Sequence, residues 1–164
     1  MNPGKILYTQ HNSLYIIKMI GMIKYTLSSD FDVFIERIFM KDDFENIIID
    51  MTETEYIDST NLGLLAKIAN YIYEHHQNKV TIISTNDDVT AILHSVGFTK
   101  IFTIIEQPLD GSVPMNELEQ SQAGSEKLGK VLLEAHEFLA NVDNQNSETF
   151  KNVIDVLKKQ QSGI

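Results

Sequence analysis

The sequence contains no cysteine and no tryptophan, and it has only three prolines. Without cysteine the chain can form no disulfide, and it offers neither a thiolate metal ligand nor a cysteine nucleophile. This composition fits a reducing compartment, so we expect a cytoplasmic protein. There is also no glycine-rich phosphate loop and no G-x-S-x-G elbow, because the glycines are isolated. Two common signatures of nucleotide-binding and hydrolytic enzymes are therefore missing.

Long hydrophobic runs and positive charge are scarce as well. The apolar piece "LYIIKMIGMI" (14–23) is interrupted by Lys18 and falls short of the roughly 20 residues that span a bilayer. The first residues lack the apolar core of a secretory signal. The formal net charge is −10, without a basic stripe. We therefore expect no membrane insertion and no direct binding of nucleic acid, and we favour a protein partner.

The first two thirds of the chain alternate strand and helix patterns. Runs rich in isoleucine and tyrosine predict strands, and apolar residues at i, i+3, i+4 and i+7 predict helices. A further helix begins in the turn 58–61 and continues to about residue 76. The other predicted elements are strands at 5–10, 13–21, 46–52, 80–84 and 100–105, and helices at 30–40 and 87–97.

This order, β-β-α-β-α-β-α-β, indicates an α/β fold. Single helices between strands imply crossover connections, and hence a mixed, largely parallel sheet with helices packed against it. One antiparallel pair is expected near the N-terminus. We assign residues 1–106 to this domain and residues 107–124, which hold two of the three prolines, to a linker.

Residues 125–164 predict a helical hairpin. Leu128, Val131, Ala135 and Leu139 form one apolar stripe, and a second stripe begins at Phe150. Ser125 and Ser147 are the expected N-caps. The hairpin would dock on the domain, hold a partner, or join two protomers in a homodimer.

No residue pattern predicts a catalytic site, a metal site or a cofactor. The histidines lack the i, i+4 spacing of a helical metal site, so all are expected to be solvated imidazoles: His11, His75, His76, His94 and His136. Three carboxylates follow the strand at 46–52. We expect Asp50 to bond loop amides, and the alternative is a weak divalent-ion site formed with Glu53 and Glu55.

The turn "IDSTN" holds four short polar residues, Asp58, Ser59, Thr60 and Asn61, directly before an apolar helix. Each is a preferred N-cap residue because its side-chain oxygen can accept a free amide of the first turn. Only one of them can be the cap, and Asp58 or Ser59 is the simplest choice. We therefore expect surplus hydroxyl and amide groups to be exposed, at the sheet edge, to another protein.

These residues also carry a family resemblance. "YIDSTNLGLL", after the strand "NIIIDMT", resembles the D-S-[S/T]-G-[L/I]-G-[L/V]-L signature of the STAS domain, the fold of bacterial anti-sigma-factor antagonists. The likeness covers about residues 5–106. It includes "TIIS…ILHSVGFTKIF", a short helix that ends in a Gly-aromatic step before the last strand.

The resemblance implies a non-enzymatic antagonist in transcription regulation, of the kind used in stress responses. In that family an anti-sigma factor that is also a serine/threonine kinase phosphorylates the turn, and a PP2C-type phosphatase reverses the modification. Carried over, Thr60 is the phosphoacceptor, with Ser59 as second choice. Asp58, Asn61 and Gly63 complete the partner-binding set. Asn61 replaces the usual glycine, and we expect it to be tolerated because asparagine adopts left-handed backbone readily.

Two other functions remain open from the sequence. The alternative is a STAS-like scaffold subunit that binds a transporter complex or a small ligand without phosphorylation. A small enzyme is the third option, which we disfavour because no base is paired with the hydroxyls of the turn.

Overall fold

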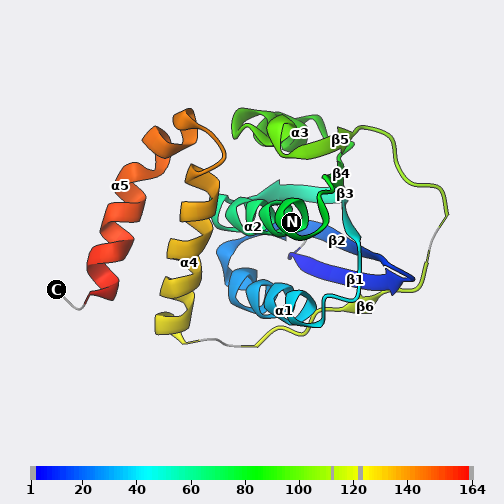
Figure 1. Cartoon of the computed structure of the whole chain (residues 1–164), viewed down its shortest axis with the longest axis horizontal. Coiled ribbons are helices and arrows are strands. Elements are labelled where there is room, and N and C mark those ends of the chain that lie inside the picture. Colours follow the sequence, from blue (N-terminus) through cyan, green and yellow to red (C-terminus); the bar gives the residue numbers. More distant parts are fainter. Residues whose placement is uncertain (1–2, 112, 122–123, 163–164) are drawn as a thin grey trace.

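The computed structural model describes residues 3–111, 113–121 and 124–162 (Figure 1). None of the helices in these ranges has the combination of length and hydropathy needed to cross a membrane. The strands are β1 (Lys5–His11), β2 (Leu14–Ile23), β3 (Asn46–Ile57), β4 (Val80–Ile83), β5 (Phe102–Ile105) and β6 (Asn116–Glu117). The helices are α1 (Ser28–Lys41), α2 (Ser59–His76), α3 (Asp87–Ser95), α4 (Ser125–Ala140) and α5 (Asn144–Gln161), with short 3-10 turns η1 (Tyr25–Leu27) and η2 (Phe98–Lys100).

The strands form one sheet in the order β5-β4-β3-β2-β1-β6. Strands β2 to β5 are parallel to one another, while β1 is antiparallel to β2. The predicted fold class, a largely parallel α/β sheet with an antiparallel pair near the N-terminus, is confirmed. Strand β6 lies inside the segment predicted as a linker and pairs with β1, so part of residues 107–124 extends the sheet.

Helices cover one face of the sheet in successive layers. Along β2, buried residues alternate with partly exposed ones, so one face of that strand is buried. Helices α1 and α2 pack on that face, α4 lies across α2, and α5 is outermost (Figure 1). Every residue of α2 from Thr60 to Ala69 is buried. The middle layer therefore contains the helix that begins in the "IDSTN" turn.

Strand β3 is longer than the sequence pattern indicates, and this changes the setting of its carboxylates. Asp50 lies in mid-strand, where its Oδ1 accepts hydrogen bonds from the backbone N–H and the hydroxyl of Thr52, at 3.0 and 2.7 Å. Glu53 pairs with Lys18 of β2. The expected loop of three carboxylates does not exist, so the weak divalent-ion alternative was wrong. Pairing with β2 extends β3 beyond the apolar run.

The α4–α5 corner is fastened to the α/β domain by polar contacts. Asp143, and not Ser147, caps α5: its Oδ1 accepts from the backbone N–H of Asn146 at 2.8 Å. Its Oδ2 accepts from Lys100 at 2.9 Å. The buried side-chain amide of Asn146 donates to the carbonyls of Val96 and Leu139, at 2.9 and 3.0 Å. At the other end of the hairpin, Gly124 takes the N-cap position expected for Ser125.

We expect Asn146→Ala to lower the free energy of unfolding by about 1–3 kcal/mol, because two buried carbonyls lose their donor. The matched control is Asn152→Ala, at an exposed position of the same helix. Urea unfolding followed by circular dichroism measures both. Equal effects of the two substitutions would contradict the anchoring role of Asn146.

The stability that the Asp143 cap contributes to α5 should also decrease in acid. Its hydrogen bond from the Asn146 amide, followed by the bond from Lys100, holds the pKa of Asp143 below its ordinary value. A lowered pKa contributes stability above the unfolded pKa of about 3.9, and that contribution disappears as pH falls through the folded value. The protection factors of the amide hydrogens at the start of α5, which are corrected for the intrinsic slowing of exchange in acid, should therefore fall as the pH drops below about 4. Asp143→Asn, which keeps a capping oxygen, should show a smaller change.

Candidate functional site

The "IDSTN" turn joins the end of β3 to α2. The Asp58 N–H donates to the carbonyl of Ile23 at 3.0 Å, which ties the turn to the neighbouring strand β2. Asp58 has extended backbone, and its Oδ1 accepts from the backbone N–H of Asn61 at 3.0 Å. Asp58 is therefore the N-cap, one of the two residues expected in that role.

Asn61 is completely buried, and both the nitrogen and the oxygen of its side-chain amide form hydrogen bonds. Nδ2 donates to Asp58 Oδ1 at 2.9 Å, while Oδ1 accepts from the hydroxyl of Ser28 at 3.1 Å. The residue lies within α2 and outside the left-handed region, so the expected reason for its tolerance was wrong. Asn61 instead joins the start of α1 to the cap of α2.

Ser59, the first residue of α2, is hydrogen-bonded to a residue far along the chain. Its Oγ lies 3.0 Å from Nε2 of His136 on α4. The Nδ1 of this imidazole lies 2.7 Å from the carbonyl of Leu132, which can only accept. In a neutral imidazole Nδ1 therefore carries the hydrogen, and the Ser59 hydroxyl donates to Nε2.

Two sequence-based expectations fail at this pair. His136 was expected to be a solvated imidazole, but it is only 5 % exposed. The turn was expected to have no base beside its hydroxyls, yet Ser59 has one. The reason is the same in both cases: α4 folds back over α2 and places a residue 77 positions away beside the turn.

Thr60, the expected phosphoacceptor, is 4 % exposed. The expectation that surplus polar groups of the turn are open to a partner was therefore wrong for Thr60 and Asn61. Ser59 is only partly buried. Its hydroxyl is thus the more accessible of the two candidate acceptors, although it is already hydrogen-bonded.

Gly63 marks the closest approach of α4 to α2. A Cβ added at Gly63 would lie 2.0 Å from the carbonyl oxygen of Ala135 and 2.4 Å from its carbonyl carbon. Any side chain at this position would force the two helices apart. Within the family signature, Gly63 thus has a packing role here that requires neither a turn nor a special backbone angle.

Lys67, one turn further along α2, is a buried ammonium group surrounded by carboxylates. It pairs with Asp32 at 2.8 Å and Glu36 at 2.5 Å, both on α1, and with Glu134 on α4. Burial alone would lower the pKa of Lys67, but the hydrogen bonds to the three carboxylates outweigh it and hold that pKa above its ordinary value. Burial raises the pKa of Asp32, and Lys67 offsets part of this effect.

These carboxylate oxygens lie within 4.8 Å of one another, a spacing that would suit a metal ion. The ammonium of Lys67 already supplies positive charge at their centre. We therefore interpret the cluster as an ionic junction of three helices.

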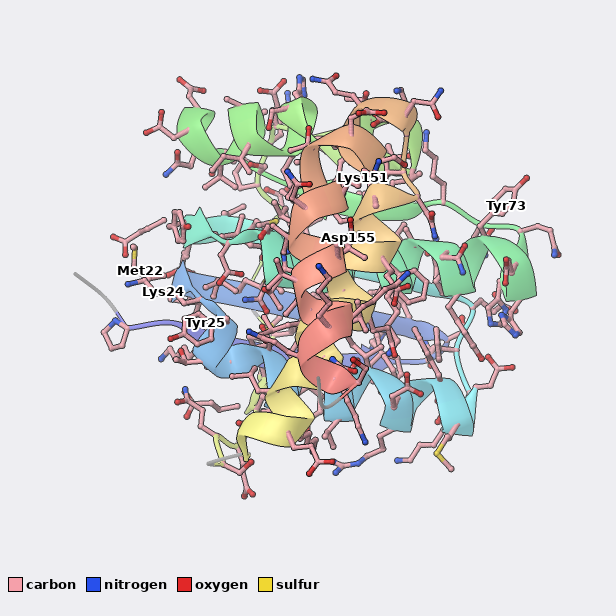
Figure 2. All side chains as sticks on the ribbon, turned by 90° about the vertical axis from the view of Figure 1, so that its left-hand side faces the viewer. Met22, Lys24, Tyr25, Tyr73, Lys151 and Asp155 are labelled. Atoms are coloured by element: carbon pink, nitrogen blue, oxygen red, sulfur yellow. The ribbon has the colours of Figure 1, made fainter. Side chains whose placement is uncertain are left out.

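Exposed apolar and aromatic side chains lie at the same sheet edge as the turn. Met22, Lys24 and Tyr25 lie together at one side of the molecule, away from Tyr73 (Figure 2). Tyr25 is 50 % exposed, and Tyr56, whose strand position is opposite Met22, is 39 % exposed. No sequence pattern singled out this rim, because solvent exposure depends on which strand ends meet at an edge.

The family model described as "STAS domain" matches residues 5–110. No curated protein sequence matches the chain.

Solved structures of low sequence identity share the fold. An anti-sigma factor antagonist from Mycobacterium paratuberculosis is 16 % identical with a TM-score of 0.56, over 64 % of this chain and 87 % of that one. SpoIIAA in its unphosphorylated form is 12 % identical with a TM-score of 0.53, over 63 % and 89 %. Bacillus SpoIIAA in the phosphorylated form is 12 % identical with a TM-score of 0.51, over 61 % and 89 %.

Gly63→Ala should separate α4 from α2, because the added methyl group would overlap the Ala135 carbonyl. Overpacking of this kind costs about 1–3 kcal/mol, against a gain of up to about 1 kcal/mol in helix propensity. The matched control is Gly129→Ala within α4, where the nearest atom, Nε2 of Gln161, is 3.9 Å from the added Cβ. Urea midpoints should fall for the first variant and hold or rise for the second. The reverse order would contradict the close contact.

Proposed function

Because the chain belongs to the STAS domain family, we propose that it acts as an anti-sigma-factor antagonist through partner switching. In this proposal the unphosphorylated chain binds an anti-sigma factor that is also a serine/threonine kinase. Phosphorylation in the turn 58–61 releases the chain, and a PP2C-type phosphatase restores binding. The observation that carries the proposal is a hydroxyl-bearing turn at the start of the central helix of this fold.

The similar structures support this role. One of them is an anti-sigma factor antagonist, and SpoIIAA is described in both phosphorylated and unphosphorylated forms. At 12–16 % identity these structures share the fold, and the role comes to this chain as a proposal.

Thr60 remains the acceptor that the family resemblance implies, and Ser59 the second choice. The burial of Thr60 means that a kinase reaches it only after local opening, whereas the partly buried Ser59 requires a smaller movement. In this proposal Asp58 and Asn61 hold the shape of the turn through their mutual hydrogen bonds. Gly63, the remaining member of the proposed partner-binding set, is covered by Ala135 of α4.

Phosphorylation would act mainly on the partner. A phosphoryl group adds about −1.5 to −2 charges, and free amides at a helix N-terminus favour such an anion. Refolding of the domain is therefore not required. A partner surface built for a neutral hydroxyl would have to desolvate the dianion. A loss of about 3 kcal/mol weakens binding roughly 150-fold, enough to exchange one partner for another.

A binding role fits the surroundings of the turn better than catalysis. Ser59 and His136 pair as a nucleophile and a base would. A substrate, however, needs a concave seat beside them. Hollows of about 590, 340 and 330 Å³ lie elsewhere on the described surface, and none of these three is lined by residues 58–61.

Incubation with the cognate kinase and ATP should add one phosphate within residues 58–61, detected by mass spectrometry of peptides. If Thr60 is the acceptor, Thr60→Val should abolish the modification. If Ser59 is the acceptor, Ser59→Ala should abolish it. Thr99→Val, at an exposed position, is the control. Phosphate found only outside residues 58–61, or not at all, would refute the proposal.

Thr60→Glu should weaken binding of the kinase by roughly 100-fold, because a contact built for a hydroxyl would have to accept a charge. Isothermal titration calorimetry with the unmodified chain as reference measures this. Thr60 is buried in the free chain, so circular dichroism must first show that the variant remains folded. Unchanged affinity would count against partner switching.

Co-purification with transporter subunits would instead favour the scaffold alternative.

A further inference from the structure

Helix α4 covers one stripe of α2 that starts in the candidate site. Ser59, Gly63 and Lys67 follow at i, i+4 and i+8, so they share a face of the helix. Three consecutive residues of α4 contact them in turn: His136 bonds Ser59, Ala135 touches Gly63, and Glu134 pairs with Lys67. While α4 remains in place, Gly63 and Lys67 are buried and the Ser59 hydroxyl is hydrogen-bonded, so an outside protein cannot cover the whole stripe.

We propose that the stripe of Ser59, Gly63 and Lys67 is a partner-binding surface and that α4 covers this surface in the free chain. The hairpin of α4 and α5 swings away when a partner takes the surface, so the chain carries its own competitor. That the partner is a kinase rests on the proposed function. That α4 can leave the surface and return to it is independent of the proposed function.

The charge arrangement allows α4 to leave without an unpaired buried charge. When Glu134 departs, Lys67 keeps its contacts with Asp32 and Glu36, which both belong to α1. Removing the only partner of a buried charge costs several kcal/mol, and here that cost does not arise. Lys67 therefore remains paired when Glu134 of α4 moves away.

The remaining polar contact of α4 with the stripe is also exchangeable. A hydrogen bond joins Ser59 to His136, and both side chains can bond water once the helices separate. What opposes opening is apolar burial, since Val131, Ala135 and Leu139 of α4 are all buried. The open form is thus a minor state in the free chain, and a partner that covers the same apolar surface favours it.

The hairpin has a pivot at one end. The bonds of Asn146 to Val96 and of Asp143 to Lys100 fasten the α4–α5 corner to the domain. At the other end, residues 106–111 and 113–121 are largely exposed, and Ser121 is held to Asp30 of α1 by exposed hydrogen bonds. Exposed hydrogen bonds exchange readily with water, so we expect the first half of α4, with Val131, to move furthest.

The absence of cysteine permits a direct test with three single Val→Cys variants of the full chain. Val131→Cys reports on the α4 cover. Val80→Cys, at a fully buried position of β4, reports on the core. Val153→Cys, at a position of α5 that is 42 % exposed, is the accessible reference. The measurement is the labelling rate with N-ethylmaleimide under native conditions. Local opening exposes only part of a structure, whereas a core thiol reacts after global unfolding.

We expect the thiol at 131 to react at least about tenfold faster than the thiol at 80, and more slowly than the thiol at 153. Glu134→Ala should raise the rate at 131 several-fold while leaving the rate at 80 unchanged. Equal rates at 131 and 80 in both backgrounds would overturn the proposal, because α4 would then be a fixed part of the core.

A second measurement separates this inference from the proposed function. The kinase that modifies the turn, added without ATP, should increase labelling at 131. A kinase that binds while position 131 stays protected would refute competition for the stripe, although the antagonist role would stand. If no kinase binds but position 131 still reacts faster than position 80, the reversible cover stands and the proposed function fails.

Discussion

The contact between Gly63 and the Ala135 carbonyl determines how the C-terminal helices meet the α/β domain. Because Gly63 has no side chain, the backbone of α4 can approach α2 directly. That approach brings the residues on either side of Ala135 within reach of Ser59 and Lys67. One small residue thus allows a hydrogen bond at the turn, from Ser59, and an ion pair about two helical turns further along α2, from Lys67. A larger residue would remove both by separating the helices.

The consequence for the candidate site is that its polar groups are held by structure on every side. Asp58 caps the helix, Asn61 bridges it to α1, and Ser59 bonds a histidine from α4. Buried polar groups must be satisfied, and here Asn61 finds partners in Asp58 and Ser28 while Ser59 finds one in His136. Such a turn is rigid and well suited to presenting one shape to a partner. Its two hydroxyl residues differ in access, because Thr60 is buried whereas Ser59 is partly buried and bonded to α4.

Much of the fold could be predicted from the sequence, since strands and helices follow local apolar periodicity. The cap at Asp58 also follows from local chemistry. The positions of His136 and Lys67 could not be predicted in this way. Lys67 lies on an apolar helix, and it becomes a buried charge because carboxylates from both α1 and α4 meet around it. The length of β3 was missed for a related reason, since its second half is held by pairing with β2.

The sequence by itself determined the order of elements, the α/β class, the presence of a C-terminal hairpin and the resemblance of the "IDSTN" turn to a known signature. All of these depend on residues close together in the chain, whose spacing is visible directly. Only the tertiary structure decided that the turn is covered, that Thr60 is less accessible than Ser59, and that His136 lies beside the turn. These facts depend on which face of α2 receives α4. That choice is made by shape and charge complementarity between segments about 70 residues apart, which local periodicity does not encode.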